Sequence, residues 1–127
     1  MLKDGIVGTA ERTVTEDITA AAVGSGRLKV LATPVMISLI EEAAWKSIAG
    51  ELESGMDTVG TKLNVEHLEP TPVGGVVRCE TKLIEIDGRR LVFSAEVFDE
   101  VGLIGRGTHE RFIVNGAKFQ SKADGRR

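Results

Sequence analysis

Residues 33–50, TPVMISLIEEAAWKSIAG, decide the fold because they predict one long helix. Thr33 is expected to be the N-cap, and Pro34 to occupy the first helical position, where its missing N–H costs nothing. Gly50 marks the expected end of the helix. The helix is apolar around much of its circumference, so we expect a sheet or a partner subunit to wrap it.

Strand patterns lie on both sides of this helix. A first strand is expected before it, in a stretch rich in threonine and valine, and four strands with alternating apolar residues are expected after it. The Asp87-Gly88 pair between two of these runs predicts a hairpin. The sequence therefore predicts an α+β fold, with one helix across a curled antiparallel sheet of about five strands joined mostly as a meander. The expected strands are residues 11–23, 58–69, 76–86, 89–99 and 103–114.

Length and charge limit the possible classes of protein. The 127 residues suit one compact domain, and a hydrophobic fraction of 42% predicts a buried core. We expect this domain to span residues 1–119 and a flexible polar tail to follow at 120–127. A net charge of -3 with scattered signs gives little reason to expect a nucleic acid partner.

The cysteine and histidine content predicts a cytoplasmic protein without a metal or another cofactor. Cys79 is the single cysteine and alternates with polar neighbours, so we interpret it as a small core residue in a reducing compartment. The N-terminus shows no apolar signal sequence, and no apolar run is long enough to cross a bilayer. Neither histidine has further ligands at metal-binding spacing.

Two polar residues, Glu41 and His67, occupy positions where apolar ones are expected, and Thr33 stands at the start of the helix. Glu41 lies on a helical line of apolar residues, whereas Glu42 has Lys46 four residues later and suits an exposed ion pair. His67 falls in step with the apolar residues of its strand. Each has an ordinary explanation: Glu41 reaches solvent from a half-buried line, Thr33 caps the helix, and His67 satisfies a backbone carbonyl. Together they are the parts of an acyl-transfer or hydrolysis site.

The last predicted strand contains the second histidine. Its alternation puts His109, Arg111 and Ile113 on one face, and a solvated face is the ordinary interpretation for the first two. Gly105 and Gly107 lack the strand-to-helix context of a phosphate loop, so we interpret them as bulges or points of close backbone approach.

At this point the sequence resembles the hotdog fold and, within it, the fluoroacetyl-CoA thioesterase-like branch. The pairing of GTxxxVxH with a distant GRGTHER carries much of the resemblance, which spans nearly the whole chain. The matching stretches are 32-ATPVMISLIEEAAWKSI-48, 60-GTKLNVEHLEPTPVGG-75, 86-IDGRRLVFSAEVFDEVGLIGRGTHERFIVN-115 and 118-KF-119.

The resemblance implies a site and an activity. The family's threonine, glutamate and histidine correspond to Thr33, Glu41 and His67 as catalytic residues. Its glycine near the thioester corresponds to Gly60, and its arginine near the site to Arg111, so both are expected to contact the substrate. The implied reaction is hydrolysis of a short-chain acyl-CoA to the acid and CoA. The implied site lies at the interface of a homodimer, and pairing of dimers into tetramers is left open.

One departure from the family qualifies this expectation. The fluoroacetyl-specific enzyme carries a longer, aromatic-bearing lid before the helix, whereas residues 20–30 here are short and contain no aromatic side chain. This argues against fluoroacetyl selectivity and leaves thioester hydrolysis as the expected activity.

The alternatives are a non-catalytic module that binds acyl-CoA or another small ligand, and a hotdog dehydratase or hydratase. The latter is disfavoured because Glu66, beside His67, points to the opposite face.

Overall fold

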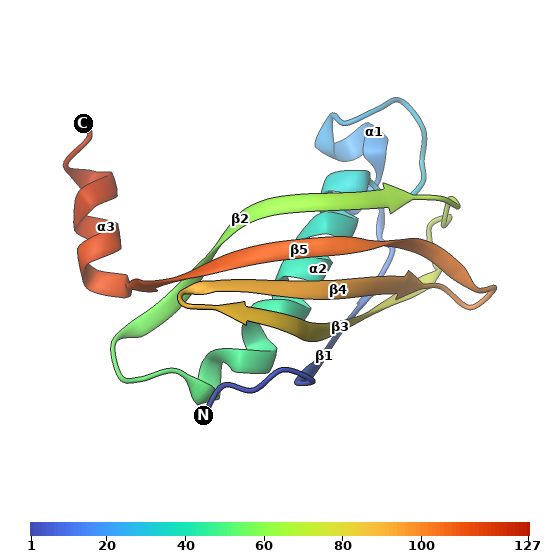
Figure 1. Ribbon diagram of the computed structural model, residues 1–127. Helices are drawn as coiled ribbons and strands as arrows, with labels where there is room; N and C mark the ends of the chain where they lie inside the picture. Colours follow the sequence, from blue (N-terminus) through green and yellow to red (C-terminus); the bar gives the residue numbers. More distant parts are fainter.

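A curled sheet of five antiparallel strands wraps one long helix (Figure 1). The structure is a computed structural model that describes residues 1–127. The helix, α2, runs over Thr33–Ile48 and lies against one face of the sheet. The predicted α+β hotdog arrangement is therefore confirmed.

The sheet has the strand order β1-β3-β4-β5-β2. β3, β4 and β5 form the predicted meander, but β2 pairs with β5 instead of with β3 and so forms one edge. The hairpin turn falls on Gly88 and Arg89, one residue later than predicted. The four strands after α2 otherwise lie close to their predicted ranges. The bounds are β1 Val7–Thr13, β2 Met56–His67, β3 Val76–Asp87, β4 Arg90–Phe98 and β5 Leu103–Asn115.

The prediction of a first strand at residues 11–23 is wrong in position. β1 ends at Thr13, and a 3₁₀ turn (Glu16–Ile18) and the short helix α1 (Ala20–Val23) follow. The Thr19 hydroxyl caps α1 by accepting a hydrogen bond of 3.2 Å from the Ala22 N–H. Threonine therefore serves here as a cap, whereas its abundance had favoured a strand.

Both ends of α2 differ slightly from the prediction. Ala32 occupies the N-cap position without a side-chain bond, and Thr33 is the first helical residue. The Thr33 hydroxyl is consequently available to a partner outside the helix. At the other end α2 stops at Ile48 and tightens into a 3₁₀ turn over Ala49–Glu51, which contains the predicted stop, Gly50.

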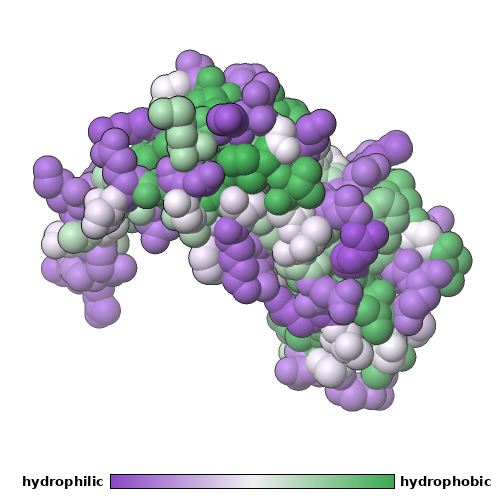
Figure 2. Space-filling view, turned by 90° about the horizontal axis from the view of Figure 1, so that it is seen from below, coloured by the Kyte–Doolittle hydropathy of each residue, from purple (hydrophilic) through white to green (hydrophobic).

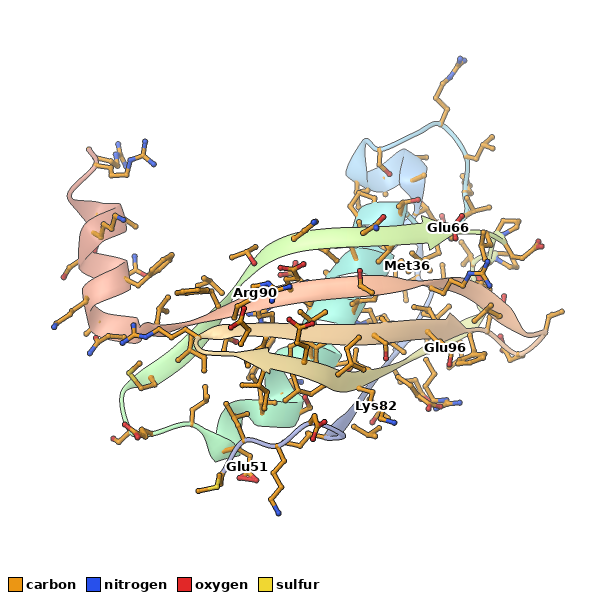
Figure 3. The ribbon with its side chains drawn as sticks, in the orientation of Figure 1. Met36, Glu51, Glu66, Lys82, Arg90 and Glu96 are labelled. Atoms are coloured by element: carbon orange, nitrogen blue, oxygen red, sulfur yellow. The ribbon has the colours of Figure 1, made fainter.

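The core lies between α2 and the sheet. Met36, which Figure 3 shows on α2 behind the sheet, is fully buried and reaches β5 at Gly105, where a Cβ atom would come within 2.6 Å of its sulfur. Cys79 is buried and unpaired, and burial raises the pKa of its thiol to about 12, as expected for a core residue. The largest buried apolar side chains include Phe93, Leu31, Leu39, Ile40, Leu83, Leu91 and Ile104.

A β-bulge interrupts the pairing of β2 with β5. Gly60 lies opposite Arg111 and Lys62 opposite Glu110, so Thr61 is an extra residue in β2. The extra residue reverses which side chains point toward the helix side of the sheet. Val59 therefore shares the outer face with Phe112, although in the sequence it falls in step with Leu63, Val65 and His67, which lie after the bulge.

A last helix, α3, follows β5 over Gly116–Asp124. It includes part of the predicted tail, and its capping residue Asn115 accepts a hydrogen bond of 3.0 Å from the Lys118 N–H. α3 stands away from the sheet in Figure 1, and this projecting end of the molecule is mostly hydrophilic in Figure 2. The flexibility of residues 120–127 stays a prediction. No helix of the protein combines the length and apolar character needed to cross a bilayer.

Candidate active site

Thr33 and His67 form the first part of the candidate site. The start of α2 and the end of β2 meet there, and the Thr33 hydroxyl oxygen lies 2.7 Å from His67 Nδ1. Thr33 thus contacts His67 instead of capping the helix. The ordinary interpretation of Thr33 as the N-cap is therefore wrong, and the sequence pattern did not predict its bond to His67.

His67 also has a free nitrogen next to a cavity. Its Nε2 atom is buried and has no hydrogen-bond partner within the chain. Burial lowers the pKa of this imidazole, which favours the neutral form that can accept a proton. The adjoining cavity of about 310 Å³ is lined by Ala20, Ser25, Val30, Leu31, Thr33, His67, Leu68, Glu69 and Pro70.

Glu41 forms the second part of the candidate site. Its half-buried carboxylate lies over Gly60, where any Cβ atom would collide with Glu41 Oε2. The same oxygen accepts a hydrogen bond of 3.3 Å from Arg111 Nη1. Gly60 therefore lies beside the carboxylate because the missing side chain leaves room for it.

Arg111 and His109 are buried beneath Glu41, so the interpretation of their face as solvated is wrong. Arg111 is exposed by 5% and His109 by 0%. The alternation correctly put both residues on one face of β5, but it did not indicate which face points inward. Pairing with β2 decides this, because His109 lies opposite Leu63 and Arg111 opposite Gly60.

The two adjacent acids of α2, Glu41 and Glu42, have different surroundings, as their positions on the helix predict. Its carboxylate binds Lys46 at 2.9 Å and Arg12 at 2.7 Å, at the surface. The first of these is the predicted ion pair. Glu41 instead faces the polar cluster of β2 and β5, in agreement with its position on the apolar helical line.

The two parts of the site do not meet within one chain. Thr33 and Glu41 are eight residues apart on α2, which separates their Cα atoms by about 12 Å at 1.5 Å per residue. His67 bonds to Thr33, whereas Glu41 bonds to Arg111. A site that uses all three predicted residues therefore needs the Glu41 carboxylate of another copy of the chain beside the Thr33–His67 pair.

Half-buried His67 and buried His109 predict a loss of stability on acidification. Burial lowers the pKa of His67 and of His109 below the ordinary 6.5. The unfolded chain then binds protons first, so the free energy of unfolding is largest above about pH 6.5 and falls as the pH drops toward the folded-state pKa values. Urea unfolding at a series of pH values is expected to show this fall. A variant with both histidines replaced by glutamine should show a shallower one, and an equally steep fall would contradict the prediction.

Comparison with known proteins identifies the family of this chain. The family model described as fluoroacetyl-CoA-specific thioesterase, FlK, matches residues 14–117. A fluoroacetyl-CoA thioesterase of Streptantibioticus cattleyicolor is 38% identical over 94 residues, which are 74% of this chain and 68% of that protein.

Solved structures agree in fold along nearly the whole chain. A structure of the thioesterase FlK superposes with a TM-score of 0.93 at 30% identity, covering 100% of this chain and 98% of that one. A mutant of FlK in complex with fluoroacetate and CoA gives 0.87 at 31% identity, covering 93% and 99%. A thioesterase superfamily member of Thermus thermophilus gives 0.89 at 28% identity, covering 98% and 92%.

Fold and site together define a hotdog-fold thioesterase, an enzyme that hydrolyses thioesters. Within this class the match covers most of the chain and includes the whole of α2, β2 and β5, the elements that carry the site. The chain belongs to the FlK family, whose model is described as fluoroacetyl-CoA-specific thioesterase.

Proposed function

We propose that the protein hydrolyses short-chain acyl-CoA thioesters at a site made by Thr33, Glu41 and His67. The observation that carries this proposal is the pairing of the half-buried imidazole of His67, whose lowered pKa favours the neutral form, with a hydroxyl beside a cavity. Gly60 and Arg111, which the sequence analysis assigned to the substrate, both adjoin Glu41. Both residues support the placement of Glu41 in the site, and Arg111 contacts its carboxylate.

The reaction follows from these groups. As a general base, Glu41 takes a proton from water, and the hydroxide oxygen adds to the thioester carbonyl carbon. The C–S bond of the resulting tetrahedral oxyanion then breaks, and the leaving CoA thiolate takes up the proton that Glu41 removed from water, relayed by His67, so that Glu41 is again ionised. As a nucleophile, Glu41 would instead form an anhydride that water hydrolyses. Both routes release the same acid and CoA.

We propose a homodimer in which Glu41 of one subunit meets Thr33 and His67 of the partner subunit. β2 is an edge strand, and a free edge can pair with a second copy. Antiparallel pairing of two β2 edges around a two-fold axis brings the His67 end of one strand toward the half of the other that contains Gly60. The unpartnered Nε2 of His67 and the 12 Å separation within α2, estimated from the helical rise, support this arrangement.

The dimer would cover further surface that is exposed in one chain. Trp45 on α2 is exposed by 40%, which is high for a large side chain next to the core.

Whether two dimers pair into a tetramer is left open. A cytoplasmic location is also proposed, supported by the unpaired thiol of Cys79.

The substrate is expected to be a small unsubstituted acyl group such as acetyl or propionyl. The segment that carries Ala20, Ser25 and Val30 lines the cavity with short side chains and has no aromatic residue. A cavity with no Phe, Tyr or Trp among its lining residues distinguishes a hydrogen from a fluorine only weakly. We therefore expect fluoroacetyl-CoA and acetyl-CoA to differ in kcat/KM by less than about tenfold after correction for the intrinsic reactivity of each thioester.

A thiol-release assay tests both the function and the substrate. Purified protein is incubated with acyl-CoA esters of increasing chain length and with fluoroacetyl-CoA, and free CoA thiol is measured. Turnover that is highest for the shortest esters is expected. Thermal stabilisation by acyl-CoA without any thiol release would instead support a non-catalytic binding module and overturn the proposal.

A further inference from the structure

The polar cluster beneath Glu41 includes one residue that the proposed chemistry does not use. His109 is fully buried beside the buried guanidinium of Arg111. Burying a charged group next to a titratable one is costly unless hydrogen bonds satisfy both. The hydrogen bonds of the two side chains therefore indicate what the arrangement does.

Arg111 is anchored on β2 through one side of its guanidinium. Nε donates to the Thr58 hydroxyl at 2.9 Å, and Nη2 donates to the Thr58 carbonyl at 3.0 Å. These two bonds fix the plane of the guanidinium. The remaining nitrogen, Nη1, lies 3.1 Å from His109 Nε2 and 3.3 Å from Glu41 Oε2.

The partners of His109 fix its tautomer. Nδ1 lies 2.9 Å from the Lys62 carbonyl, which only accepts, so Nδ1 carries the proton. Arginine only donates, so Nε2 must accept from Arg111 Nη1. The imidazole is therefore neutral and bridges a backbone carbonyl to the guanidinium. Burial, together with the positive charge of Arg111, lowers its pKa and favours this same form.

The surrounding strands hold the imidazole ring in place. Lys62 directly follows the bulge of β2, which positions its carbonyl toward β5. Phe93 of β4 stacks on the ring with centroids 6.2 Å apart and an angle of 30° between planes. Because Phe93 is itself fully buried, His109 has little freedom to rotate.

We propose that His109 is a positioning residue for Glu41 and acts through Arg111. This inference rests on the proposed catalytic role of Glu41. By accepting one N–H of Nη1, His109 leaves this nitrogen only its second N–H, which donates to Glu41 Oε2. The other carboxylate oxygen then remains available to water or to the thioester.

Loss of this acceptor would change how Arg111 holds the carboxylate. An arginine with unused N–H groups favours two parallel bonds to a carboxylate. Without the bond to His109, Nη1 and the second N–H of Nη2 could together engage both oxygens of Glu41, which would make the carboxylate a weaker base and nucleophile. Binding of the thioester, which does not depend on His109, would be affected less than turnover.

A matched pair of substitutions tests the proposal. The amide of His109→Asn lies near the position of Nδ1 and can still donate to the Lys62 carbonyl, but it does not reach Arg111. The amide oxygen of His109→Gln lies near the position of Nε2 and can accept from Arg111. We expect His109→Asn to lower kcat for acetyl-CoA hydrolysis by about tenfold or more, with a smaller change in KM, and His109→Gln to keep most of the turnover.

Two further measurements separate the possible outcomes. Circular dichroism and thermal unfolding show whether both variants fold, and equal kcat values for the two folded variants would overturn the proposal. The Arg111→Lys variant lacks the guanidinium that could bond both oxygens of Glu41, so adding His109→Asn to it should lower kcat little further. If His109→Asn lowers kcat as much in this variant as in the wild type, the proposal is overturned. If the wild-type protein itself releases no thiol, the proposed function has failed instead.

Discussion

Glu41→Gln is expected to lower kcat for acyl-CoA hydrolysis by about 10²–10⁴-fold, the usual contribution of a positioned general base. Glutamine has nearly the same shape and can still accept a hydrogen bond from Arg111, but it neither takes up a proton nor attacks a carbonyl. The steady-state rate of CoA thiol release measures the loss of kcat. A variant with wild-type turnover would remove Glu41 from the mechanism.

Glu42→Gln is the matched control for this experiment. It makes the same chemical change one residue along α2, at a carboxylate that binds Lys46 and Arg12 at the surface. Surface ion pairs of this kind contribute about 0–1 kcal/mol to stability. We therefore expect turnover close to wild type from Glu42→Gln.

Mixing two inactive variants is expected to restore activity if the site spans two subunits. In a mixed dimer of Glu41→Gln and His67→Ala, one site has both substitutions and the other retains intact Glu41 and His67. Random pairing makes half of the dimers mixed, so about a quarter of the wild-type rate should return. The restored rate is large compared with that of either variant alone, and co-expression with two affinity tags allows the mixed dimer to be purified.

The same experiment has a clear negative outcome. If all catalytic residues of a site came from one subunit, each subunit of the mixed dimer would lack one of them. Purified mixed dimers without activity would then contradict the arrangement across subunits. Activity lost by His67→Ala but restored by imidazole in solution would still assign His67 to proton transfer.

Local sequence patterns predicted most of the fold. The apolar residues of α2 between Pro34 and Gly50 defined the helix, and the alternating runs defined the four later strands. The first strand was misplaced because threonine favours both strands and helix caps, and Thr19 serves as a cap. The pairing of β2 with β5 was not predicted, because a contact between strands distant in sequence leaves no signal in either strand alone.

The candidate site was predicted less completely. The helical phase selected Glu41 over Glu42, and the polarity of His67 marked it as unusual. His109 and Arg111 shared a face in the pattern, but the inward direction of that face depends on the neighbouring strands. A buried arginine and a buried histidine two residues apart look the same in the sequence as a solvated pair.

The bulge at Thr61 makes the site sensitive to chain length as well as to residue identity. One added residue lets Gly60, before it, and Leu63, Val65 and His67, after it, all face α2. Without that residue the alternation would run unbroken, and the second half of the strand would turn its side chains over. A single-codon deletion there would remove His67 from Thr33 while changing neither residue. We therefore expect such a deletion to lower thiol release as much as a substitution of His67 does.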